Sequence, residues 1–174
     1  MRDQIRFSIV RCVALVLSVL GCSEAFAENV QGTFESANAS SEAIDKAIEA
    51  GIAKMNFIAR PIARSRLKKT NPLYQRIVIA HDGAQISIRY DDAKPVVAPA
   101  DGTAVKWTRD DGEVFDVSAR STDAQLQQTF KAEDGQRVNE FSLAPDGILT
   151  LKVTLTSPQL PAPVTYTLQY RKSG

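Results

Sequence analysis

The sequence predicts a mainly β fold: an antiparallel up-and-down meander of about eight to ten strands that closes into a barrel, preceded by an N-terminal helical pair. Turn signals recur from residue 74 onward, the stretches between them alternate apolar and polar residues, and residues 40–70 have a helical period instead. Asp-Gly favours two-residue hairpins of type I′, whose central residues both need positive φ. It occurs at Asp82-Gly83, Asp101-Gly102, Asp111-Gly112, Asp134-Gly135 and Asp146-Gly147.

The first 27 residues have the parts of a secretory signal peptide: basic residues, an apolar run over 12–20 and a small-x-small cleavage site at Ala25-Phe26-Ala27. The apolar run is shorter than the roughly 20 residues that a membrane-spanning helix needs. Cleavage after Ala27 would leave 174 − 27 = 147 residues, the length of one domain. The basic residues are Arg2, Arg6 and Arg11.

The same segment has an alternative interpretation, because Val19-Leu20-Gly21-Cys22 resembles the lipobox of bacterial lipoproteins. The resemblance implies a lipoprotein signal over 1–21 and acylation of Cys22. Both interpretations predict export: to the periplasm or out of the cell in the first case, and to an outer-membrane anchor in the second. Cys12 and Cys22 both precede Ala27, so cleavage there leaves no thiol and excludes disulfides.

The charge balance does not favour nucleic acid as a partner. Without the first 27 residues the chain has 21 − 3 = 18 basic and 20 − 2 = 18 acidic residues, a formal balance of zero. No overall field would attract a polyanion, so we expect no nucleic-acid binding.

The helical pair follows a polar segment over 28–39 that contains one candidate strand. A helix is predicted from about 41 to 58, because one apolar stripe recurs every three or four residues. Pro61 fits the first turn of a second helix, which we expect to run to about Lys69. The stripe consists of Ile44, Ile48, Ile52 and Met55.

Residues 74–171 have the period of two that is typical of antiparallel strands with one buried face. A single open sheet of this size would expose long edges, and closure into a barrel removes them. Lys94–Pro99 contains two prolines and therefore suits only an edge or a bulge. Val138 is out of phase with Phe141 and Leu143, which predicts a bulge near Asn139-Glu140.

The order of one strand, two helices and about nine strands resembles the calycin barrels, and the fatty-acid-binding topology in particular. Gly32-Thr33-Phe34 is similar to the Gly-x-Trp that opens lipocalins, and residues 142–150 resemble the Asp-Gly hairpin of small secreted bacterial lipocalin-like proteins. The resemblance implies a barrel whose mouth is covered by the helices. The Arg-x-Tyr carboxylate clamp of fatty-acid-binding proteins is missing, since Leu168 and Gln169 precede Tyr170.

Inward-facing aromatic residues are the candidate ligand-binding residues. They would line the barrel interior whether it is a packed core or a cavity. Gln128 shares a face with Leu126 and Phe130, so it is either the polar contact for a ligand or a glutamine paired with a neighbouring group. The candidate set is Trp107, Phe115, Gln128, Phe130, Phe141 and Tyr166.

A basic cluster near the end of the second helix is the most asymmetric charge on the chain. It either contacts an anionic membrane or partner surface, or complements the dipole at the end of the helix. The cluster consists of Arg60, Arg64, Arg66, Lys68 and Lys69.

No catalytic or metal-binding constellation is visible. His81 is the only histidine and is expected to be an exposed turn residue, and one histidine without thiolates makes a poor transition-metal site. Asp91-Asp92 and Asp110-Asp111 lack the dense acidic spacing of calcium loops and fit polar turns. We therefore predict no catalytic residue, no metal and no cofactor.

Two functions remain open. The first is an exported, non-enzymatic, lipocalin-like barrel that binds a small apolar or amphipathic ligand. The second is a structural or interaction protein of the cell envelope, with a packed barrel and no ligand, which would be a lipoprotein under the lipobox interpretation. The size of the interior distinguishes them, because a ligand needs a cavity of about 300 Å³ or more.

Overall fold

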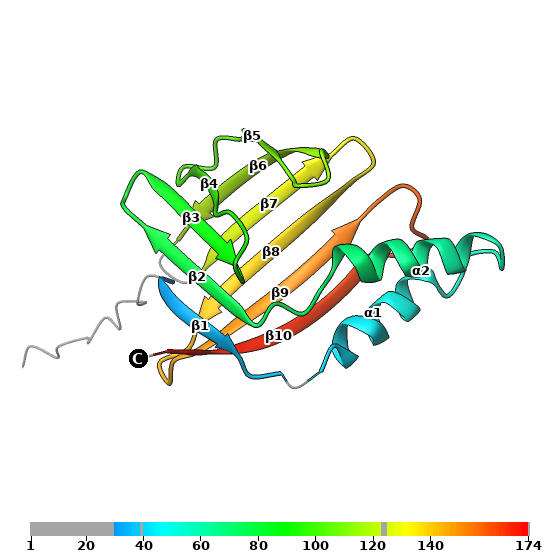
Figure 1. Ribbon diagram of the computed structural model, residues 1–174, viewed down its shortest axis with the longest axis horizontal. Helices are drawn as coiled ribbons and strands as arrows, with labels where there is room; N and C mark the ends of the chain where they lie inside the picture. Colours follow the sequence, from blue (N-terminus) through cyan, green and yellow to red (C-terminus); the bar gives the residue numbers. More distant parts are fainter. Residues whose placement is uncertain (1–29, 39, 123–124, 174) are drawn as a thin grey trace, which may run out of the picture.

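The fold consists of ten antiparallel strands and two helices in a computed structural model that describes residues 30–38, 40–122 and 125–173 (Figure 1). The predicted signal peptide and Cys22 lie outside the described residues. No helix of the described ranges is long and apolar enough to cross a membrane. The elements are β1 Gly32–Ser36, α1 Glu42–Ile52, α2 Ala59–Thr70, β2 Arg76–His81, β3 Gln85–Tyr90, β4 Val96–Pro99, β5 Val105–Thr108, β6 Val114–Ser121, β7 Leu126–Ala132, β8 Gly135–Leu143, β9 Ile148–Thr156 and β10 Val164–Lys172.

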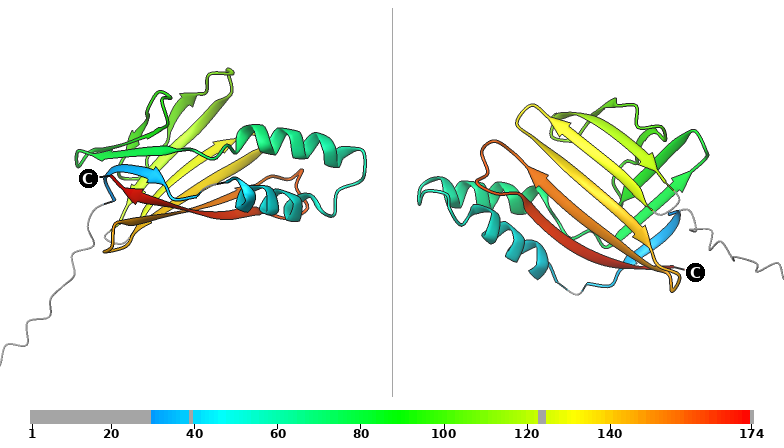
Figure 2. Two further views of the ribbon diagram at one scale, coloured as in Figure 1. Left: turned by 60° about the horizontal axis from the view of Figure 1, so that its bottom comes forward. Right: turned by 180° about the vertical axis from the view of Figure 1, so that it is seen from behind.

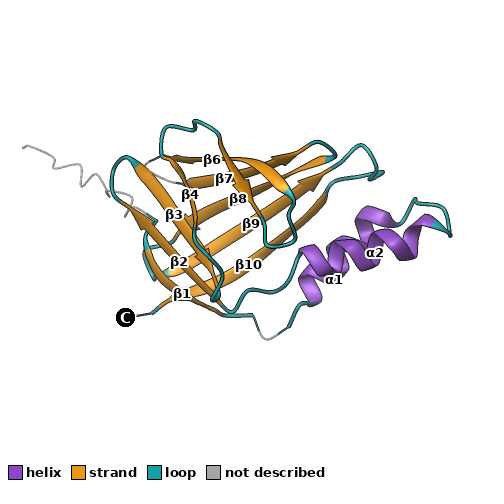
Figure 3. Ribbon diagram, turned by 45° about the horizontal axis from the view of Figure 1, so that its top comes forward, coloured by secondary structure: helices purple, strands orange, loops and turns teal. Residues whose placement is uncertain are grey.

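The strands form a nearly closed barrel (Figure 3). Strands that follow one another pair in antiparallel ladders, except β4 and β5, and β1 pairs with both β2 and β10. The two edge strands, β4 and β5, are joined by no ladder, and an isolated bridge between Asp101 and Arg120 closes part of the gap. The predicted fold class is confirmed, and so is the edge position of the proline-containing strand β4.

Helices α1 and α2 form a hairpin at one end of the barrel (Figure 2). Helix α1 packs on β10 through Ile44, Ile48 and Ile52, which are almost completely buried. Gly51 makes this close packing possible, because a Cβ there would lie 2.4 Å from Cγ2 of Val164. The apolar stripe of the sequence therefore marks the face of α1 that covers the barrel.

The first helix ends six residues before the predicted boundary at 58. Side chains fix the turn that replaces its last part: Nη2 of Arg60 donates to the carbonyls of Ala53 and Met55, at 2.6 and 2.9 Å. Oδ1 of Asn56 accepts from the backbone N–H groups of Ile58 and Ala59, at 3.1 and 2.8 Å. An asparagine that accepts these bonds starts a new helix, so the chain turns here instead of continuing.

The Asp-Gly connections do not have the predicted type I′ geometry, and Asp101-Gly102 forms no hairpin, because it joins β4 to β5, which are not paired. Only the glycine has positive φ in four of the five dipeptides, at Gly83, Gly102, Gly112 and Gly147. In the β5–β6 hairpin, for example, the N–H of Gly112 donates to the carbonyl of Arg109, and the N–H of Arg109 donates to that of Glu113. This is the pattern of a type I turn followed by a left-handed glycine, a longer connection than the two-residue loop expected.

The predicted bulge near Asn139-Glu140 is also wrong. The register of β8 is continuous against both neighbours, from Gln136 paired with Thr156 to Leu143 paired with Leu149 on the β9 side. The apolar residues of β8 are out of phase in the sequence because its first inward positions hold polar residues, Arg137 and Asn139, while Val138 faces outward. Polar residues inside the barrel, and not an irregular backbone, explain the pattern.

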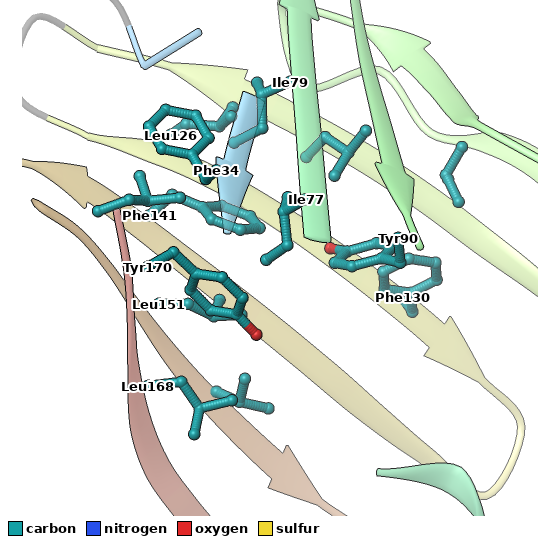
Figure 4. Packing of buried hydrophobic residues seen from close by; sticks show 14 of the residues in the cluster. Phe34, Ile77, Ile79, Tyr90, Leu126, Phe130, Phe141, Leu151, Leu168 and Tyr170 are labelled. Carbon is teal, nitrogen blue, oxygen red and sulfur yellow. The ribbon is translucent and has the colours of Figure 1, made fainter. Parts of the chain in front are cut away.

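The barrel end opposite the helices is filled by a packed core. Phe34, Ile77, Phe141 and Leu151 have no exposed surface and come from strands that lie far apart in the sequence (Figure 4). This core leaves only the helical end of the interior for a site.

Candidate functional site

A cavity of about 470 Å³ lies at the helical end of the barrel. The up-and-down order places four connections at the same end as the helices: β3–β4, β5–β6, β7–β8 and β9–β10. Helix α2 and residues of all four connections line the cavity. Its volume lies within the range of about 300–1,000 Å³ that is usual for small-molecule sites.

One wall of the cavity is aromatic. The rings of Trp107, Phe115 and Phe130 contact one another with centroids 5.6–6.1 Å apart. These separations are typical of favourable aromatic pairs. Tyr74 and Tyr90 add a second pair at 4.6 Å. The wall suits an apolar group.

A polar chain of hydrogen bonds lies beside this wall. Nε of Arg137 donates to Oδ1 of Asn139 at 2.8 Å, and Nδ2 of Asn139 donates to the Tyr90 hydroxyl at 2.9 Å. That hydroxyl donates in turn to Oε1 of Gln128 at 2.6 Å. Asn139 and Gln128 are each about 1% exposed, so the chain satisfies polar groups that would otherwise be costly to bury.

Arg137 also connects the barrel interior to helix α2. Its Nη1 donates to the carbonyl of Thr70 and to Oδ1 of Asn71, both at 3.3 Å. The same oxygen of Asn71 accepts from the Tyr166 hydroxyl at 3.1 Å. The positive charge of Arg137 is favourable at this position, because the C-terminal end of α2 is the negative end of the helix dipole. These bonds hold the end of α2 on the barrel.

The charge of Arg137 has no acidic counterpart in the described part of the chain. None of the ion pairs among these residues includes it. Burial raises the pKa of the Tyr90, Tyr166 and Tyr170 hydroxyls, which stay neutral near pH 7 and supply no balancing charge. A half-buried guanidinium at a cavity is therefore available to an anion.

The candidate ligand residues fall into two groups. Trp107, Phe115 and Phe130 line the cavity together. Gln128 lies in the buried hydrogen-bond chain, Phe141 lies in the packed core, and Tyr166 is bonded to Asn71.

Sequence reasoning missed four residues around the cavity: Tyr90, Asn71, Arg137 and Asn139. The signal for two of them was present, because Arg137 and Asn139 have the same phase as Phe141 in β8. The Arg-x-Tyr pattern concerns Tyr170 in β10, where it is missing, whereas the arginine inside the barrel is Arg137 in β8.

The basic cluster is largely engaged within the protein. Arg60 binds the carbonyls of the helix-connecting turn. Three others form exposed ion pairs, which contribute little to stability. The pairs are Arg64 with Glu49, Arg66 with Asp134, and Lys68 with Asp45; Lys69 lines the cavity.

His81 and the acidic pairs have structural positions. His81 is the last residue of β2 and is half-buried, not an exposed turn residue. Oδ1 of Asp91 accepts the backbone N–H groups of Gln75 and Arg76, and Asp111 pairs with Arg109. No group of three or more His, Cys, Asp or Glu side chains among the described residues could hold a metal ion.

No family model and no curated protein match the chain. Among solved structures it is similar to the fatty acid transporter REP1-NXSQ, with a TM-score of 0.53 at 14% identity over 83% of this chain and 96% of that one. The fold is that of the fatty-acid-binding proteins. Fatty-acid-binding protein 1 of Echinococcus granulosus gives a TM-score of 0.51 at 14% identity over 83% and 98% of the two chains. The Schistosoma mansoni fatty-acid-binding protein in complex with arachidonic acid gives a TM-score of 0.51 at 15% identity over 83% of this chain and 96% of that one. At these identities the likeness shows the fold alone.

Proposed function

We propose that this protein binds one small amphipathic molecule inside its barrel, with an acidic head group at Arg137 and an apolar tail against the aromatic wall. The observation that carries the proposal is a cavity of about 470 Å³ that combines Trp107, Phe115 and Phe130 with a guanidinium lacking an acidic partner among the described residues. The cavity favours this function over a packed barrel without a ligand.

The atoms of Arg137 support an anionic head group. Nε and Nη1 are bonded to Asn139, Thr70 and Asn71. Nη2 has no such partner among the described residues and is left to donate to a ligand. A carboxylate matches the planar guanidinium better than a neutral group does, because both the charge and the geometry of the hydrogen bonds fit.

A carrier function, without catalysis, is part of the proposal. The similar solved structures are named as a fatty acid transporter and fatty-acid-binding proteins, and one of them is in complex with arachidonic acid.

Fluorescence of Trp107 tests the proposal, since it is the only tryptophan of the chain and lies in the cavity wall. Dodecanoate should change its emission saturably with one site per chain, and dodecan-1-ol should do so more weakly. Native mass spectrometry should show one bound molecule. Binding of neither compound would contradict the proposal, and equal binding of both would reject the role of Arg137.

We also propose that the protein is exported, on the basis of its first 27 residues. Mass spectrometry of the mature N-terminus distinguishes the two interpretations. A chain that begins at Glu28 supports signal-peptide cleavage, and a diacylglyceryl mass on Cys22 supports a lipoprotein. A chain that retains Met1 after expression in a bacterial host with both pathways would contradict export.

A further inference from the structure

Three large apolar side chains are exposed together where α1 turns into α2. Phe57 is 82% exposed, Ile58 66% and Ile62 68%. Single exposed apolar residues are normal on a protein surface, but neighbouring ones mark a contact site. We call these three residues the apolar tip.

An ordered backbone presents the apolar tip to solvent. Asn56 accepts the backbone N–H groups of Ile58 and Ala59, and Arg60 binds the carbonyls of Ala53 and Met55. The turn lies at the end of the hairpin farthest from the strands in every ribbon view (Figures 1, 2 and 3). The barrel therefore does not cover it.

The hairpin that carries the apolar tip is strongly cationic. Residues 42–70 contain seven basic and three acidic residues, a net charge of 7 − 3 = +4, whereas the whole chain has +1 and the remainder therefore −3. Lys54 is exposed three residues before Phe57. The ion pairs of α2 are exposed, so exchanging their carboxylates for lipid phosphates costs little.

We propose that the helical hairpin docks on an anionic lipid bilayer, with the apolar tip inserted at the boundary between head groups and acyl chains and the surrounding cations on the phosphates. Apolar side chains beside lysine and arginine are the combination that holds a helix at such an interface. Three side chains at a tip offer less area than the about 800 Å² per partner that a stable protein interface buries. The charge and the small apolar area together favour a lipid surface over a second copy of the chain.

Co-sedimentation with vesicles tests the docking, using the chain with Cys22→Ser in every protein so that acylation makes no contribution. Binding should be strong on vesicles with about one third phosphatidylglycerol and weak on pure phosphatidylcholine, and added salt should reduce it. The double variant Phe57→Ser/Ile62→Ser should bind the anionic vesicles at least about tenfold more weakly. Lys54→Glu should also weaken it.

Val114→Ser is the matched control, because Val114 is 51% exposed and belongs to β6, not to the hairpin. It should bind the vesicles like the unmodified chain. Unchanged binding of the double variant, or an equal loss in the control, would overturn the proposal. The membrane proposal would also be overturned, in favour of self-association, if the parent bound no vesicles and the double variant had a smaller sedimentation coefficient than the parent. The variants at positions 54, 57, 62 and 114 should keep the thermal midpoint of the Cys22→Ser parent, since these four residues are exposed.

Discussion

Replacing Arg137 by glutamine should separate binding of an acid from binding of an alcohol. Arg137 uses Nε and Nη1 for Asn139, Thr70 and Asn71, which leaves Nη2 for a ligand. Glutamine keeps polarity in the cavity but removes the charge. A hydrogen bond to a charged group contributes about 1.5–3 kcal/mol, which corresponds to about 10- to 150-fold in Kd. The Arg137→Gln variant should therefore bind dodecanoate weaker by about that factor and dodecan-1-ol almost unchanged.

The assay is the same Trp107 titration with both ligands on the parent, Arg137→Gln and a matched control. The control is Arg89→Gln, which removes one cation from an exposed position of β3 and should change neither Kd by more than about twofold, because exposed charges are screened. Equal weakening of acid and alcohol in Arg137→Gln would show that the variant damages the cavity. Unchanged acid binding would refute the role of the guanidinium.

Three further predictions concern stability. Gly51→Ala should lower the free energy of unfolding in urea by about 1–3 kcal/mol, because its Cβ would lie 2.4 Å from Val164; an increase would disprove the packing of α1 on β10. Tyr170→Phe should raise it by about 1 kcal/mol, since the buried hydroxyl has no partner among the described residues, and a marked loss would show that the hydroxyl is satisfied. Burial raises the folded pKa of Tyr90, Tyr166 and Tyr170 above the unfolded value of 10.0, so the folded state binds these protons more tightly. The free energy of unfolding should therefore be steady up to about pH 10 and fall at higher pH, and a rise there would contradict the assignment.

Much of the fold could be predicted because the spacing of apolar residues in the sequence indicates which face of each strand or helix is buried. The alternation in β9 and β10 gives eight inward residues in phase, from Leu149 to Leu155 and from Val164 to Tyr170. The stripe of isoleucines likewise gives the packed face of α1. Long elements that bury one face leave little freedom in register, so their pattern is reliable.

The wrong predictions concern segments whose conformation depends on local hydrogen bonds and loop length, which hydrophobic periodicity does not show. The end of α1 depends on the bonds of Asn56 and Arg60 to the chain around 53–59, which periodicity does not show. At Asp111-Gly112 and Asp146-Gly147 the turns differ from type I′ because their loops are one residue longer than the two-residue template. The β7–β8 loop has two residues, but they are 133–134, so the Asp-Gly pair is shifted by one position.

The site was harder to predict because its polar residues interrupt the alternation of apolar and polar residues by which a strand is recognised. Arg137 and Asn139 occupy inward positions that hydrophobic periodicity assigns to apolar residues. Their partners, Tyr90, Gln128 and Asn71, come from β3, β7 and the end of α2, so only the fold brings them together. The aromatic wall was predictable in composition, whereas its separation from the packed core at Phe141 was not.

A crystal structure of the protein with a long-chain fatty acid carrying a terminal bromine would show directly whether the barrel holds an acid at Arg137. We expect anomalous scattering from the bromine near the aromatic wall of Trp107, Phe115 and Phe130, with the carboxylate within hydrogen-bond distance of Arg137. A cavity filled by side chains, or a ligand whose carboxylate lies away from Arg137 outside the barrel, would contradict it.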